Sequence, residues 1–172
     1  MTPIQECIQN KNSKLNPIWI MRQAGRYLPE FREIRAKNPN FIKLCLNESL
    51  SSEITLQPIK RFDFDAAIIF SDILMLPYGL DQEVKFEKGL GPKLGELDLN
   101  RLESINGNEF SKKLNSVYKS ISKTSVNPIL NNKDLIGFVG APWTILVYMI
   151  NKMSPKNNLS KKIFKDKLFV KK

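Results

Sequence analysis

The chain has 172 residues, enough for one domain with a sizeable core, and 42% of them are apolar and 26% charged, which excludes wholesale disorder and collagen-like or coiled-coil structure. Lys and Arg number 27 against 17 Asp and Glu, so the net charge is +10, but eight of the lysines lie in the segment Lys152–Lys172. Because the basic charge is concentrated at one end of a nearly neutral body, the composition gives little reason to expect nucleic-acid binding.

Histidine is absent, and the only two cysteines, Cys7 and Cys45, have no paired spacing. This argues against a zinc site of His and Cys ligands and against Ser-His-Asp or Cys-His catalysis. Two cysteines make no disulfide framework, which indicates a reducing compartment. Residues 1–14 lack the apolar core of a signal peptide, and the longest uncharged run, Leu135–Ile150, is too short and too interrupted by Gly and Pro to predict a membrane span.

The first elements in chain order are predicted from short local signals. Residues 18–21 are an apolar run after a proline and predict a strand, and the segment 22–29, with a glycine and a proline, predicts a loop. Residues 30–37 resemble one short helix.

A longer helix and a buried strand are predicted next. Asn47 is a suitable N-cap for a helix that carries Leu50 and Ile54 on one face, and Pro58 is expected to kink or end that helix. The continuous apolar run 66–70 is typical of a strand buried on both faces in a parallel sheet.

The rest of the chain predicts strands and helices in alternation. Residues 84–86 predict a short strand, and residues 109–124 predict an amphipathic helix with its apolar positions at Phe110, Leu114, Val117 and Ile121. Residues 135–139 predict a strand, and a proline at position 142 suits the first turn of a helix through Met149. Residues 163–170 predict the start of one more helix or strand. Strands that alternate with helices indicate a parallel α/β architecture.

Two arginines, Arg22 and Arg26, lie four residues apart around a glycine, at the end of the first predicted strand. A guanidinium stays charged and forms paired hydrogen bonds with carboxylates and phosphates, so the natural ligand of this loop is a polycarboxylate or a phosphate. Two surface arginines in an ordinary turn are the alternative, and the loop alone does not decide between them.

Two further segments carry candidate chemistry. Ser71 and Asp72 directly follow an apolar strand, at the end where α/β proteins place ligand groups, although either residue could simply cap a helix. Residues 137–144 contain glycines that permit close backbone approach, and Tyr148 follows about one and a half helical turns later. The alternative is that the aromatic residues of this segment only fill the core.

Taken together, these segments resemble signatures of the uroporphyrinogen decarboxylase family. The matching strings are residues 17–29 (PIWIMRQAGRYLP), residues 69–74 (IFSDIL), residues 137–144 (GFVGAPWT) with Tyr148 and Met149, and the glycine-proline loop 89–92. Their order and approximate spacing agree with the family, and the resemblance extends from Thr2 to Met153.

The resemblance implies an α/β fold of the (β/α)8 TIM-barrel type. A complete barrel needs roughly 200 to 250 residues, so residues 1–172 are expected to be one incomplete domain, the N-terminal half of a barrel, with the Lys-rich segment 152–172 inside it. The resemblance also implies a cytoplasmic homodimer that needs no metal or organic cofactor and converts uroporphyrinogen III to coproporphyrinogen III by removing four acetate carboxylates. We expect neither nucleic acid nor a membrane as a partner, and we expect this chain to be inactive by itself.

The resemblance further implies roles for single residues. Arg22 and Arg26 match arginines that meet substrate carboxylates, Asp72 matches the acid that binds the pyrrole N–H groups, and Tyr148 matches a tyrosine that assists it. The other expected substrate contacts are Gln23, Ala24, Gly25, Phe70 and Ser71. Protonation of a ring carbon lets the pyrrole accept the electrons of the broken bond, and the resulting cation needs an anion nearby, which Asp72 can supply. Arg26 or Arg22 is the expected proton donor, although arginine is a poor acid.

Two other readings stay open at this point. A corrinoid-linked methyltransferase of the same superfamily would share the barrel, but it would use zinc with His and Cys ligands, and the arginine loop argues against it. A non-catalytic module could bind RNA or an anionic membrane through Lys152–Lys172. A steep salt dependence of nucleic-acid affinity, lost on deletion of that segment, would support the second reading.

Overall fold

The structure is a computed structural model that describes residues 1–10, 16–87 and 89–154. The chain forms two compact units. The first unit comprises Met1–Ser71 and Asn115–Phe138, and the second comprises Asp72–Leu114 and the part of the chain from Val139 onward. Most of the Lys-rich segment and the element expected at residues 163–170 lie outside the described residues.

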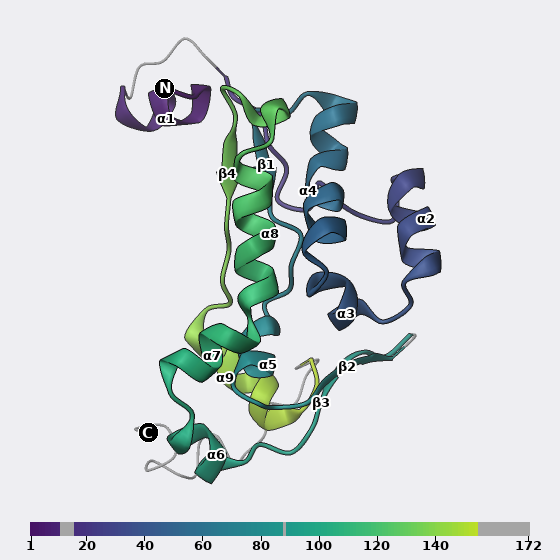
Figure 1. Ribbon diagram of the computed structural model, residues 1–172, viewed down its shortest axis with the longest axis vertical. Coiled ribbons are helices and arrows are strands. Elements are labelled where there is room, and N and C mark those ends of the chain that lie inside the picture. The colour runs from purple at the N-terminus through teal and green to yellow at the C-terminus, as the bar shows by residue number, and fades with distance from the viewer. Residues whose placement is uncertain (11–15, 88, 155–172) are drawn as a thin grey trace. The chain divides into compact units, whose positions relative to one another are not determined.

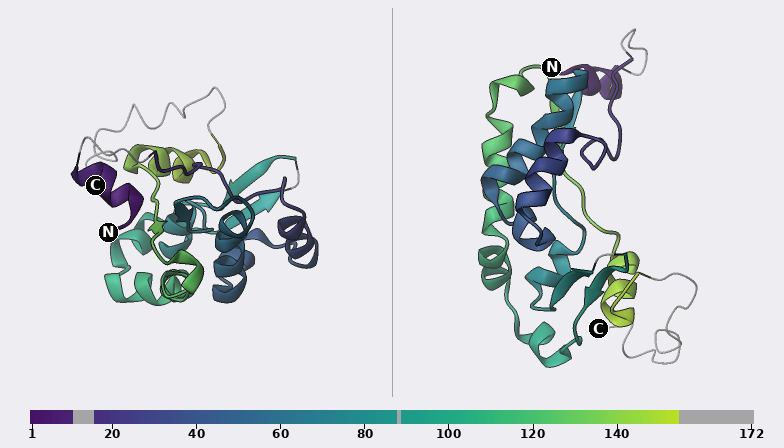
Figure 2. Two further views of the ribbon diagram at one scale, coloured as in Figure 1. Left: turned by 90° about the horizontal axis from the view of Figure 1, so that it is seen from above. Right: turned by 90° about the vertical axis from the view of Figure 1, so that its right-hand side faces the viewer.

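The first unit is a helical layer on a short parallel sheet (Figure 1). Its elements are α1 (Pro3–Gln9), α2 (Pro29–Lys37), α3 (Phe41–Cys45), α4 (Glu48–Phe62), β1 (Ala66–Ile68), α8 (Asn115–Ser125), the 3-10 helix η1 (Pro128–Leu130) and β4 (Asp134–Ile136). Strand β1 pairs with β4 in parallel, with Ala67 opposite Leu135. Helices α4 and α8 pack side by side, and α4 also packs on β1 (Figure 2). The predicted parallel α/β pairing is therefore confirmed for these two strands.

Helix α4 begins as predicted but does not end as predicted. The side chain of Asn47 accepts a hydrogen bond from the backbone N–H of Leu50 at 3.0 Å, which confirms the N-cap. The expectation that Pro58 kinks or ends the helix is wrong, because α4 continues to Phe62. Beyond the proline, Ile59 packs in a buried cluster with residues of β1 and η1, and this tertiary packing keeps the helix together despite the missing backbone donor.

The predicted strand at residues 18–21 is absent. Of these residues, Ile18 alone is bound to the strand region, through its N–H to the carboxylate of Asp65 at 2.7 Å and through its carbonyl to the N–H of Asp65 at 2.9 Å. The apolar side chains of the segment are exposed in the described structure. An apolar run becomes a strand only where a ladder partner lies alongside it, and here that partner is missing beyond the first residue.

The two predicted sheet strands are shorter than their apolar runs. The prediction at 66–70 is confirmed for β1, and one further ladder bond runs from the N–H of Ile69 to the carbonyl of Ile136 at 3.0 Å. The strand predicted at 135–139 is confirmed only in part. Phe138 and Val139 have left the sheet, and Val139 is 75% exposed.

The second unit surrounds a β-hairpin with short helices. Its elements are α5 (Met75–Gly79), β2 (Val84–Glu87), β3 (Gly91–Leu94), α6 (Leu99–Ser104), α7 (Gly107–Lys113) and α9 (Pro142–Asn151). The strand predicted at 84–86 is confirmed as β2, which pairs antiparallel with β3. The proline that opens α9 is at its first turn, as predicted. Gly91, the first residue of β3, has a φ of +87°, a conformation that favours glycine where the hairpin turn enters the strand.

The single helix predicted at 109–124 is wrong, because the structure has two helices there. Helix α7 ends at Lys113, Leu114 has φ −98° and ψ 8°, and α8 begins at Asn115. The break coincides with the boundary between the two units. The apolar period continues across the break because each helix needs a buried face in its own unit. Among the described residues, no helix is long and apolar enough to cross a membrane.

Candidate active site

The arginine loop has a fixed backbone and free charged ends. The N–H of Leu28 bonds to the carbonyl of Gly25 at 3.0 Å, and the Leu28 side chain is buried in the core of the first unit. Ala24 packs partly against the same core. Arg22 and Arg26 are exposed, and neither guanidinium forms an ion pair with any described residue. The loop therefore presents two unpaired cations from an anchored backbone.

Gln23 lies between the two arginines but is buried. Its side-chain Nε2 donates to the carbonyl of Ala66 at 2.9 Å, and its Oε1 accepts from the N–H of Ile20 at 3.2 Å. The hydroxyl of Tyr27 donates to the backbone carbonyl of Gln23. The predicted substrate contact through this side chain stays a prediction, but most of the hydrogen-bonding capacity of its amide group is used within the protein.

Phe70 is held by two hydroxyl groups that sequence reasoning missed. Its N–H donates to Oγ1 of Thr55 at 2.8 Å, and its carbonyl accepts from Oγ of Ser51 at 2.6 Å. Its ring makes edge contacts with the rings of Phe31 and Phe41, with centroids 5.8 Å apart in both pairs. Two hydroxyl residues four apart on the buried face of a helix, just before an apolar strand, are the sequence signal that could have identified this clamp.

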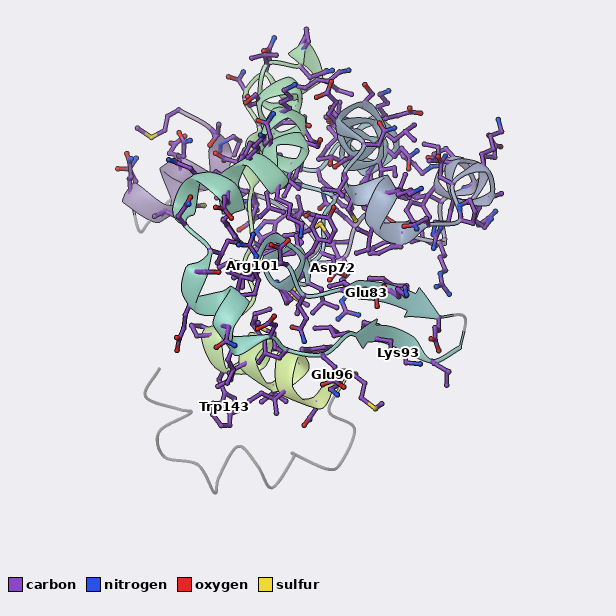
Figure 3. All side chains as sticks on the ribbon, turned by 60° about the horizontal axis from the view of Figure 1, so that its bottom comes forward. Asp72, Glu83, Lys93, Glu96, Arg101 and Trp143 are labelled. Carbon is purple, nitrogen blue, oxygen red and sulfur yellow. The ribbon has the colours of Figure 1, made fainter. Side chains whose placement is uncertain are left out.

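Asp72, labelled in Figure 3, is the first residue of the second unit and precedes the first residue of α5 by three positions. Its Oδ1 accepts a hydrogen bond from the N–H of Leu74 at 2.8 Å. Burial raises the pKa of the Asp72 carboxyl above its ordinary value, and the bond from Leu74 acts in the opposite direction. The helix cap considered for this residue is not what the structure shows, because the N-cap of α5 is Leu74 and the bond from Leu74 to Asp72 closes a turn before the helix. This bond occupies Oδ1 of the carboxylate, and no hydrogen bond joins Oδ2 to another described residue.

The third segment packs against the residue that follows Asp72. A Cβ added to Gly140 would lie 2.7 Å from Cγ1 of Ile145 and 3.2 Å from Cβ of Ile73, so the backbone of the 140 turn approaches both side chains closely. Helix α9 continues from this turn and carries Tyr148, whose hydroxyl lies 3.3 Å from Oγ of Ser154.

The structure thus brings the predicted site residues together in two groups. In the first unit, the arginine loop and Phe70 share one core, since Ala24 and Phe70 both pack against it. In the second unit, Asp72 and the turn that leads to Tyr148 meet at Ile73. Among the described residues, no group of three His, Cys, Asp or Glu side chains is arranged to hold a metal ion.

These features define the class of the protein: an α/β protein with a parallel strand pair, an exposed basic loop, and a partly buried acid shortly after a strand. The family described as uroporphyrinogen decarboxylase (URO-D) matches residues 1–171, and the chain belongs to this family. The family resemblance of the sequence is thereby confirmed.

Curated relatives support the same assignment. A uroporphyrinogen decarboxylase of Chelativorans sp. (strain BNC1) is 48% identical over 134 residues, which are 78% of this chain and 39% of the relative. One of Agrobacterium fabrum is 46% identical over 134 residues, again 78% of this chain and 39% of the relative. One of Caulobacter vibrioides is 47% identical over 140 residues, 80% of this chain and 39% of the relative. The chain matches about 39% of the length of these relatives.

Proposed function

We propose that this chain supplies the carboxylate-binding loop and the central acid of a uroporphyrinogen decarboxylase. The substrate would be uroporphyrinogen III, and the product coproporphyrinogen III. The observation that carries the proposal is the arginine loop, which exposes two guanidinium groups from a fixed backbone, with no ion pair to any residue that the structure describes, in a chain of this family. A substrate with eight carboxylates needs fixed positive charge at its binding site, and exposed guanidinium groups provide it.

Asp72 is the proposed stabiliser of the reaction intermediate. Each decarboxylation replaces a carboxylate by a proton. A proton adds to a ring carbon next to the acetate-bearing carbon, and carbon dioxide leaves as the electrons of the breaking C–C bond flow into the ring. The exocyclic methylene that results takes up a proton to become a methyl group, and the ring carbon releases its added proton, which restores the pyrrole. The ring is cationic before the bond breaks, so an anion already in place lowers the barrier. A partly buried carboxylate is suited to this role, because its interaction with a cation formed on the substrate would be weakly screened by water, and that cation would favour the ionised form of the acid.

The remaining features of the proposal follow from family membership. Strands β1 and β4 would be neighbouring strands of a (β/α)8 barrel to which residues 1–172 contribute, and Tyr148 would assist Asp72. Gly25, Ala24 and Ser71 would line the substrate site. The proposed enzyme is a cytoplasmic homodimer that needs no bound cofactor, because the pyrrole itself accepts the electrons.

The proposal is tested by complementation. The chain is co-expressed with the part of the Chelativorans relative that it does not match, and coproporphyrinogen formation is measured under anaerobic conditions. Arg22→Lys and Arg26→Lys keep the charge but lose the planar fork, so we expect a higher KM or a lower kcat with unchanged unfolding. Arg61→Lys is the control, because Arg61 is ion-paired with Glu30 in the same unit. Wild-type-like turnover in both loop variants would contradict the proposal.

A further inference from the structure

We propose that Gln23 is a positioning residue that fastens the arginine loop to strand β1, rather than a residue that contacts substrate. The inference deepens the proposed function, since it concerns the residues assigned there to carboxylate binding. Gln23 is 2% exposed, although the arginines on either side of it, Arg22 and Arg26, are exposed. A buried amide in the middle of an exposed basic loop needs an explanation, because burying a polar group is costly unless its hydrogen bonds are made.

The bond to Ala66 lies on a specific edge of the strand. In the parallel pair, the carbonyl of Asp65 and the N–H of Ile69 face β4, where they bond to Asp134 at 3.0 Å and to Ile136 at 3.0 Å. Alternate residues of a strand direct their backbone groups to opposite edges, so the carbonyl of Ala66 faces away from β4. The amide of Gln23 bonds that carbonyl at 2.9 Å. The side chain therefore occupies a ladder position on the edge of β1 that no other strand of the described residues covers.

The other polar atoms of Gln23 close the loop on itself. Oε1 accepts from the N–H of Ile20 before the arginines, and the backbone carbonyl accepts from the hydroxyl of Tyr27 after them. The ring of Tyr27 in turn stacks on Phe62 of α4, with centroids 6.2 Å apart. Gln23 thus ties three points together: the entry of the loop, its exit and the first residue of β1. Both arginines project from backbone between or beside these fixed points.

A merely structural glutamine elsewhere in the chain provides the matched control. Gln82 in the second unit is 4% exposed, and its Nε2 donates to the carbonyls of Gly95 at 3.0 Å and Met149 at 2.9 Å. Both glutamines therefore join distant backbone segments through a buried amide. If Gln23 contributes only general stability, methionine at either position should have similar local consequences.

The test uses trypsin on the full chain under native conditions. Cleavage after Arg22 and Arg26 is measured by mass spectrometry and divided by cleavage after Arg101, in wild type, Gln23→Met and Gln82→Met. Loss of the amide bonds should raise this ratio about tenfold in Gln23→Met, because local opening exposes the loop to the protease. Gln82→Met should not raise it. An unchanged ratio in Gln23→Met, including the case where all sites become equally sensitive because the chain unfolds, overturns the proposal.

A second measurement separates positioning from folding. In the complementation mixture, Gln23→Met should raise the KM for uroporphyrinogen more than it lowers kcat, since the charges are present but no longer held in place. Gln82→Met should leave KM unchanged per folded molecule. If the wild-type mixture shows no decarboxylation, the proposed function fails, and the cleavage ratio still decides whether Gln23 fastens the loop.

Discussion

Removing the hydroxyl of Thr55 tests directly how hydrogen bonds hold the segment that leads to Asp72. Thr55 is 0% exposed, and its Oγ1 accepts from the N–H of Phe70 at 2.8 Å while donating to the carbonyl of Ser51 at 2.7 Å. Thr55→Val removes the hydroxyl but keeps the branched shape. The variant therefore creates almost no cavity, and its effect reports on hydrogen bonding alone.

The expected cost follows from the fate of the Phe70 amide. In Thr55→Val, the N–H of Phe70 loses the acceptor that a fully buried side chain supplies. An unsatisfied buried donor costs about 1–3 kcal/mol. The carbonyl of Ser51 remains within α4, where the helical ladder supplies its own donor. We therefore expect Thr55→Val to lower the free energy of unfolding by about 1–3 kcal/mol.

Urea denaturation measures the total loss, and amide hydrogen exchange measures where it falls. We expect exchange at Phe70 to accelerate more than exchange at Ala67 in the preceding strand β1. Thr124→Val is the matched control, because Thr124 is equally buried and donates to the carbonyl of Ser120 at 2.7 Å on α8. It should destabilise the chain without singling out Phe70. A Thr55→Val chain with wild-type stability, or with no preferential exchange at Phe70, would refute the reasoning.

Four further predictions concern single residues of the two units and the chain as a whole. Burial raises the pKa of Asp72, so the folded chain binds the proton of this acid more readily than the unfolded chain does. The stability that protonation contributes is fully present below the ordinary pKa of 3.8 and is lost as the pH rises through the raised pKa. Asp72→Asn should therefore resist urea better than wild type at pH 7, and this difference should fade towards pH 3. Gly140→Ala should cost about 1–3 kcal/mol in urea denaturation, because its methyl group would overlap Ile145. Gly137→Ala, with open space around the added carbon, should change stability by less than about 0.5 kcal/mol. Assayed alone, the chain should release no carbon dioxide from uroporphyrinogen and should self-associate in light scattering, because among the described residues β1 and β4 pair with no other strand.

The elements that could be predicted from sequence are those specified by neighbouring residues. Asn47 caps α4 through a donor three residues away, and Pro142 opens α9 because its missing N–H would have had no partner there. The apolar run that became β1 needs only to be buried, which its composition already indicates. Each of these signals acts over a few neighbouring residues, so it can be recognised in the sequence without knowledge of the fold.

The wrong predictions share a different cause, because each depended on a partner distant in sequence. Residues 18–21 have strand composition but lack a ladder partner beyond Ile18. Leu114 continues an apolar period that the fold divides between two bodies. Pro58 should disrupt a helix, yet packing on both sides of it preserves α4. In all three cases, contacts between residues distant in sequence outweigh the local conformational preference and determine the secondary structure.

The candidate site divides in the same way. Arg22, Arg26 and Asp72 could be selected from sequence because charge identifies them. The positions that hold their backbone could not, since Gln23 bonds a residue 43 positions away and Thr55 bonds one 15 positions away. Amide and hydroxyl side chains are common everywhere, and only the fold shows which of them are buried against a functional segment.

There is an electrostatic reason why neutral side chains, Gln23 and Thr55, hold the backbone of these segments. Ion pairs do join elements in this protein, as where Arg61 bonds Glu30 between α4 and α2 at 2.8 Å, but both partners are then engaged with each other. A loop held by an ion pair to Arg22 or Arg26 would have one fewer cation available for a carboxylate ligand, and breaking that pair would oppose binding. The uncharged amide of Gln23 fixes the backbone without occupying either charge. Thr55 likewise holds the residue two positions before Asp72 without placing a counter-ion beside it, which in the proposed function leaves the acid available to face a cation formed on the substrate.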